Sequence, residues 1–205
     1  MNHAFLGAMQ FASPFAASAE HTDAAGSEQV IPTSDGVVEG TLTVPLAARG
    51  VVVFLHASSA GRFEARQRFA AQVLQQAGLA TLQVDLLTPA EEATLPLGQH
   101  RAQDTLLMVE RALSVFTWLG NHAGTTKLAV GVFATTAEVV VALSAAERTQ
   151  RVAAVLSQGG CPDFFDETLS QVRVPTLLIV GQSELARAPE LAAEFFERHL
   201  GNAHR

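Results

Sequence analysis

The stretch KLAVGVFATTAEVVVAL, residues 127–143, decides the fold of this chain. It opens with an apolar run, LAVGVF, of the kind found in strands that are buried on both faces. A short turn, ATTAE at residues 134–138, follows, and then a run that we expect to be helical over TAEVVVALSAAER. A strand, a sharp turn and a helix in this order predict a parallel sheet whose strands alternate with helices. One alternative stays open: EVVVAL continues as a strand, because three consecutive valines are poor helix formers.

The rest of the chain repeats this alternation. Five further apolar runs predict strands at residues 37–44, 49–56, 79–85, 152–158 and 175–181. Helices are expected at residues 64–78, 101–120 and 189–200, each ending at or just before a glycine. In each helix, apolar residues recur at helical spacing and are predicted to face inward. They are Phe69, Val73 and Ala77 in the first, Leu106, Val109, Leu113 and Phe116 in the second, and Leu191, Phe195 and Phe196 in the third. LLTPAEEATLPLGQH, residues 86–100, has two prolines and predicts a long loop.

Length and composition indicate one globular domain. The chain has 205 residues, of which 48% are hydrophobic and 16% are charged. Residues 1–28 form an Ala/Ser-rich extension, and residues 29–205 form the predicted domain. The net charge of −7 and the lack of a Lys/Arg cluster exclude a basic surface for nucleic acid.

The amino-terminal residues and the single cysteine bear on the compartment. Cys161 is the only cysteine, so the chain cannot form an internal disulfide, which favours the reducing cytoplasm. The opening MNHAFLGAMQFASPFAASAEHT resembles a secretory leader in its small apolar residues, but it has no Lys or Arg near Met1. No run approaches the roughly 18 consecutive apolar residues of a membrane-spanning helix. We therefore expect a cytoplasmic protein without a membrane span.

Polar residues follow the ends of the predicted strands, where parallel sheets bind their ligands. These residues lie in HASSAGR at 56–62, DLLT at 85–88, ATTAE at 134–138, QGGCPD at 158–163 and GQSE at 181–184. The seven histidines are too scattered for a metal site, and the chain has neither a phosphate-binding loop nor a dinucleotide fingerprint. No metal and no cofactor are expected. Asp85 and Asp163 are expected to fasten loops.

The order of these strand and strand-end segments resembles that of an α/β-hydrolase of the dienelactone hydrolase-like group, over roughly residues 29–184. The resemblance implies a mostly parallel sheet with helices on both faces and an ester or lactone hydrolase activity. In that family the nucleophile is a serine or cysteine in a Gly-x-Ser-x-Gly turn. Thr136 holds this position here, and Ala134 and Glu138 replace the glycines. A β-branched residue is a poor fit to the strained turn, so the turn is predicted to be relaxed.

The catalytic partners implied by the resemblance are incomplete. Glu184 matches the place of the triad acid. Only residues 182–205 follow Gly181, and the helix at 189–200 uses about 18 Å of this segment, so the last strand and the histidine loop of the family are predicted to be missing. His199 and His204 do not match the family's histidine position. A threonine without an imidazole at about 2.6–3.2 Å lacks a base.

Several candidate residues have structural interpretations that we favour. Thr135 and Thr136 are expected to cap the following helix, and His56 is expected to be structural. Backbone N–H groups of Ala57 and Ala137 would still form an oxyanion hole, where a carbonyl or an anion could bind beside His56 without reacting. Cys161 is the strongest intrinsic nucleophile, but no Lys, Arg or His adjoins it, which predicts an ordinary thiol.

The leading hypothesis is a hydrolase-fold protein that has lost catalysis and acts in binding a small molecule or a protein partner. The alternative is a carboxylic-ester hydrolase that uses Thr136, Glu184 and a non-standard histidine such as His199, from this chain or from a second subunit. Loss of the last strand would also expose a sheet edge. We expect that either residues 1–28 cover this edge or two chains meet there as a homodimer.

Overall fold

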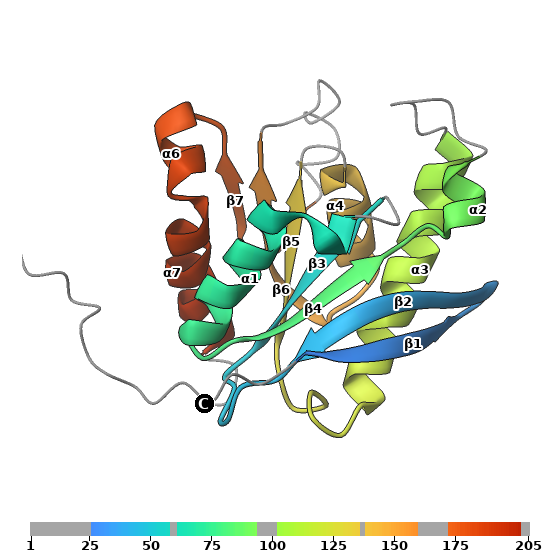
Figure 1. Cartoon of the computed structure of the whole chain (residues 1–205), viewed down its shortest axis with the longest axis horizontal. Helices are drawn as coiled ribbons and strands as arrows, with labels where there is room; N and C mark the ends of the chain where they lie inside the picture. The colour runs from blue at the N-terminus through green and yellow to red at the C-terminus, as the bar shows by residue number, and fades with distance from the viewer. Residues whose placement is uncertain (1–25, 58–60, 94–101, 136–137, 160–171, 202–205) are drawn as a thin grey trace, which may run out of the picture.

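The computed structural model describes residues 26–57, 61–93, 102–135, 138–159 and 172–201. Their centre is a seven-stranded sheet in the order β1-β2-β4-β3-β5-β6-β7 (Figure 1). The strands from β4 to β7 in that order pair in parallel, and β1 and β2 are antiparallel additions at one edge. The strands are β1 Ser27–Thr33, β2 Gly36–Thr43, β3 Val51–His56, β4 Ala80–Asp85, β5 Val130–Thr135, β6 Val152–Gln158 and β7 Thr176–Ile179.

Helices cover both faces of this sheet. On one face lie α1 (Ala65–Gln76) and α7 (Ala188–Leu200), and on the other lie α3 (Ala102–Asn121) and α4 (Val139–Glu147) (Figure 1). Three short helical segments complete the described elements: η1 Gly61–Phe63, α2 Pro89–Glu92 and α6 Gln182–Ala186. No helix among the described ranges is long and apolar enough to cross a bilayer.

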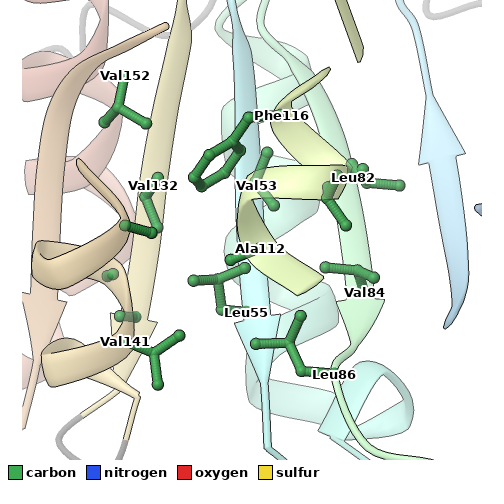
Figure 2. Packing of buried hydrophobic residues seen from close by; sticks show 14 of the residues in the cluster. Val53, Leu55, Leu82, Val84, Leu86, Ala112, Phe116, Val132, Val141 and Val152 are labelled. Carbon is green, nitrogen blue, oxygen red and sulfur yellow. The ribbon is translucent and has the colours of Figure 1, made fainter. Parts of the chain in front are cut away.

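The core explains why these runs form buried strands. Every residue of β3 and β4 is buried, as expected for strands covered on both faces. Phe116 and Ala112 of α3 face Val53 and Leu55 of β3 (Figure 2). On the opposite face Phe196 of α7 lies fully buried against β5, where a Cβ added to Gly131 would come within 2.6 Å of the Phe196 ring. The glycine at position 131 therefore lets α7 approach the strand closely.

A buried arginine fixes the β1–β2 hairpin to the helical layer. The Arg111 side chain of α3 is 4% exposed and binds carboxylates from two other elements. Its Nη2 lies 2.5 Å from Asp35 Oδ2, in the β1–β2 turn, and 2.7 Å from Glu91 Oε1 of α2. Hydrogen bonds from Arg111 are the main cause that lowers the pKa of both carboxyls, that of Glu91 to about 2.

The predicted fold class is confirmed, and so are the helix at α4 and the helix at α7, which has Pro189 in its first turn and Gly201 directly after its last residue. The open alternative, a strand over residues 138–143, is wrong, because these apolar residues are buried between the sheet and α3 as a helix. Strand β1 lies partly in the predicted extension and was not expected. The predicted loop at 86–100 contains α2, which begins with a capping box between Thr88 and Glu91.

Two of the predicted inward positions are also wrong. Phe69 is 53% exposed, and α1 instead buries Gln67, Ala70, Ala71 and Leu74, because its small residues permit close packing beside α7. Leu106 is 63% exposed in the first turns of α3, while Val109 and Phe116 are buried as expected. In α7, Phe196 is fully buried, but Leu191 and Phe195 are only partly buried.

Candidate functional site

The carboxyl ends of the parallel strands bring polar side chains to one edge of the sheet. His56 ends β3, Asp85 ends β4, Thr135 ends β5 and Gln158 ends β6. This edge is where such sheets bind ligands. Three of the predicted site residues, Thr136, Ala137 and Cys161, lie outside the described residues, as do Asp163 and His204.

Glu138 links the carboxyl ends of two neighbouring strands, β3 and β5. Its side chain is 8% exposed and turns back toward the end of β3. Glu138 Oε1 accepts a hydrogen bond from the Ala57 backbone N–H at 3.3 Å, and Glu138 Oε2 accepts one from the Thr135 hydroxyl. The two residues that it joins follow neighbouring strands, β3 and β5. Sequence reasoning treated Glu138 only as a bulky replacement for glycine and missed this role.

This contact determines what the edge can do chemically. Ala57 supplies the N–H that the sequence predicted as an oxyanion donor, and a carboxylate now occupies it. An oxyanion hole works because donors wait, unpaired, for the charge that develops in the transition state. A carboxylate in that position both occupies the donor and repels a second negative charge.

Thr135 does not cap α4 as predicted. The helix begins after Glu138, which forms no side-chain capping bond with the described residues. The Thr135 hydroxyl instead donates to Glu138 Oε2, and among the described residues no backbone N–H of α4 donates to this hydroxyl. The backbone carbonyl of Thr135 accepts the Glu138 N–H at 3.2 Å, which closes the turn.

His56 is buried and neutral at the end of β3. Burial lowers the pKa of its imidazole from 6.5 to about 4, opposed by the neighbouring Gln83 side chain and assisted by the charge of Arg62. Its side chain shares a face of the sheet with Val52 and Phe54, the face covered by α1, because residues two apart in a strand point the same way. At neutral pH this ring is a hydrogen-bonding group of the interior, which supports its structural interpretation.

The predicted triad acid and histidine do not meet. Glu184 lies on α6, and its exposed carboxylate accepts a hydrogen bond from Ser183 Oγ at 2.7 Å, the main cause that lowers its pKa. His199 lies in the last turn of α7 against Phe195. The next residue, Leu200, packs on Gly50, which precedes β3, so this end of α7 lies at the amino ends of the strands. His199 of the same chain is therefore at the wrong end of the sheet to serve as the base.

A pocket near the edge was not foreseen. Its volume is about 220 Å³, and Arg62, Asp85, Glu39 and Thr88 supply its polar groups. Arg62 Nε lies 2.8 Å from Asp85 Oδ2, which confirms that Asp85 fastens a loop, here the one that carries η1. Two further carboxylates, from Glu28 of β1 and Glu39, bind the other nitrogens of Arg62. An arginine soon after a strand end was the available signal in the sequence.

The described residues hold no group of three or more His, Cys, Asp or Glu side chains that could bind a metal ion. The acidic side chains around Arg62 are used in ion pairs with it. In the described part of this edge, Arg62 forms ion pairs with the acidic side chains around it, and the buried Glu138 carboxylate accepts hydrogen bonds from Ala57 and Thr135.

Comparisons with known proteins agree with the fold. No protein-family model matches the chain. It is similar to a solved structure of dienelactone hydrolase from Anabaena variabilis, with 32% identity, a TM-score of 0.76 and coverage of 86% of this chain and 99% of that chain. An esterase from Pyrococcus furiosus matches at 12% identity and a TM-score of 0.66, over 85% of this chain and 92% of that one, which bears on the fold alone.

Two curated proteins, both from Mycobacterium tuberculosis strains, are 44% identical over 147 residues. Each is named a putative phosphoribosyl transferase. The match covers 70% of this chain, and the chain spans about a third of the length of these relatives, 32%.

Proposed function

The chain belongs to the dienelactone hydrolase-like group of the α/β-hydrolase superfamily, and on this premise we propose that it is a non-hydrolytic member that acts in binding or interaction. The observation that carries the proposal is the Glu138 carboxylate on the Ala57 N–H. Hydrolysis of an ester passes through a tetrahedral intermediate whose oxygen needs that donor. The protein's own carboxylate competes for the donor in every encounter with a substrate.

The neutral, buried His56 supports the same proposal. A hydroxyl nucleophile requires a base that takes its proton, and a histidine with a pKa of about 4 is a weak proton acceptor at neutral pH. The exposed Glu184 is bonded to its neighbour Ser183 and orients no imidazole among the described residues. The described residues therefore supply Thr136 with neither a base of suitable pKa nor an acid that orients one.

A second candidate function remains a carboxylic-ester hydrolase that uses Thr136, Glu184 and a histidine from outside the described residues or from a second subunit. The relationship to a protein named dienelactone hydrolase, over 99% of that chain, favours it. Glu138 would then have to leave Ala57 before each turnover.

Turnover of an activated short-chain ester, p-nitrophenyl acetate, separates the two candidates. The purified chain is expected to give the buffer rate, and so are Thr136→Ala and the control Thr126→Ala, whose hydroxyl donates to the Gly120 carbonyl. A rate above buffer that disappears in Thr136→Ala and survives in Thr126→Ala defeats the proposal. A rate that survives both changes but disappears in Cys161→Ala identifies a thiol nucleophile and also defeats it.

The curated relatives support a role beside other protein segments. A longer protein that includes a segment 44% identical to this chain places a hydrolase fold next to additional chain. This chain spans only about a third of those proteins, so the name phosphoribosyl transferase describes the longer proteins.

A further inference from the structure

Three buried side chains beneath the ligand edge have atoms with no hydrogen-bond partner among the described protein groups. They are His56 Nε2, Gln67 Oε1 and Gln83 Oε1. The three residues are 4%, 3% and 8% exposed, so bulk solvent does not reach these atoms. Buried polar atoms are nearly always satisfied by protein or by ordered water, and each exception requires an explanation.

The strand register places two of the three side chains together. His56 pairs with Asp85 in the parallel ladder of β3 and β4, and Gln83 lies two residues before Asp85. Gln83 and His56 therefore project from neighbouring strands to the same face of the sheet. The Gln83 side chain lies close enough to act on the imidazole as a hydrogen-bonding neighbour that raises the pKa of His56, but no hydrogen bond of acceptable geometry joins them, and His56 Nε2 and Gln83 Oε1 have no partner among the described groups.

The packing of α1 places Gln67 at the same height along the strands as His56. Gln75 of α1 donates to the Thr81 hydroxyl of β4 at 2.7 Å, which fixes the helix against this face. Eight helix residues back from Gln75 to Gln67 cover about 12 Å. Four strand residues from Thr81 to Asp85 cover about 13 Å in the same direction, because α1 runs antiparallel to β4. Gln67 thus faces the ends of β3 and β4, where His56 lies.

The hydrogen-bonding capacities of the three atoms are complementary to one water molecule. Each glutamine Oε1 is an acceptor, and a neutral histidine provides one N–H donor. A water donates two hydrogen bonds and accepts at least one, and buried waters typically make about three. We propose that one ordered water lies between α1 and the ends of β3 and β4, donating to Gln67 Oε1 and Gln83 Oε1 and accepting from Nε2–H of His56.

This assignment fixes the tautomer of His56. With the proton on Nε2 used by the water, the ring presents a donor at the base of the ligand edge and no free acceptor on that nitrogen. The water lies in the interior of the protein, and its contacts do not depend on whether the chain hydrolyses esters. It adds a binding site for water between α1 and the sheet.

A high-resolution crystal structure of the full chain tests the geometry. A water with all three contacts at about 2.7–3.2 Å supports the proposal. A direct bond from His56 Nε2 to either glutamine, or a dry contact among the three side chains, overturns it. Nitrogen chemical shifts of the imidazole at neutral pH give an independent readout: the Nε2–H tautomer is expected, and the Nδ1–H tautomer contradicts the proposal.

Oxygen-17 magnetic relaxation dispersion counts long-lived internal waters in solution. Gln67→Leu is expected to lower the count by one relative to the unmodified chain. The matched control Gln75→Leu lies on the same helix but has its own partner, Thr81, and is expected to leave the count unchanged. Equal counts in the unmodified chain and in Gln67→Leu overturn the proposal. If Gln67→Leu does not fold, the crystal structure and the tautomer of the unmodified chain still decide.

Discussion

Removing the Glu138 carboxylate should destabilise the protein because it leaves a buried donor without its acceptor. Ala57 is 5% exposed, so its N–H loses Glu138 Oε1 in a buried position when Glu138 becomes alanine, and a water that enters the vacated space restores only part of that bond. An unsatisfied buried donor costs about 1–3 kcal/mol. Thr135 is half-buried, and its hydroxyl can turn to solvent at little cost. The expected net loss is about 2 kcal/mol.

Urea unfolding followed by circular dichroism measures this change, and a thermal melt should show a midpoint lower by about 4–8 °C for a chain of this size. Glu147→Ala, an exposed position at the other end of α4, is the control and should stay within about 0.5 kcal/mol. Glu138→Gln keeps an amide oxygen for Ala57 and should fall much closer to the unmodified chain than Glu138→Ala does. Glu138→Ala as stable as Glu147→Ala would refute the account of the Ala57 contact.

Two further predictions concern acid stability and assembly. The pKa values of Asp35 and Glu91 are lowered in the folded protein, that of Glu91 to about 2, so the stability that they contribute is present above about pH 4.5 and is lost as the pH falls toward 2. The stability difference between the unmodified chain and Glu91→Gln, about 1 kcal/mol at most after solvent screening, should therefore shrink over that interval in urea titrations, and a constant difference would contradict the pairing with Arg111. β7 is an edge strand among the described residues, and an open edge is usually covered or paired. Light scattering should therefore show either that the full chain is a dimer, or that it is a monomer and a chain shortened to residues 26–205 is a dimer. If both chains are monomers, both expectations are wrong.

Burial explains which elements could be predicted from the sequence. β3 and β4 are covered on both faces, and the long apolar runs of their sequences, five of the six residues in β3, made them visible as buried strands. β1 lies at an edge with most of its residues exposed, and Pro32 interrupts its pattern, which an edge strand tolerates. Its sequence resembles a loop because its environment is nearly that of one.

The faces of the helices were harder to assign than their positions. In α1 the large Phe69 is exposed, whereas Gln67, Ala70, Ala71 and Leu74 form the buried face that packs on α7 and the sheet. Hydrophobicity alone favours the larger residue. Which face of α1 meets α7 and the sheet is decided by tertiary packing.

The sequence predicted which strand ends lie at one edge of the sheet, but not the contact between Ala57 and Glu138. The sequence placed Ala57 and the turn at 134–138 on one edge, since both follow parallel strands. The bond from Ala57 to Glu138 joins residues 81 positions apart and depends on one side-chain rotamer. No local pattern encodes such a bond, so the carboxylate could be identified only from the folded chain.

Covalent attachment gives the Glu138 carboxylate an advantage over any dissolved acid. A group tethered next to its partner acts at an effective concentration that short links raise to the millimolar range or beyond. A free carboxylate or acyl compound must therefore compete with the Glu138 carboxylate at this effective concentration before its binding to the Ala57 N–H can be detected. Compound libraries are therefore best screened against Glu138→Ala, where weak occupants of that N–H would no longer be outcompeted.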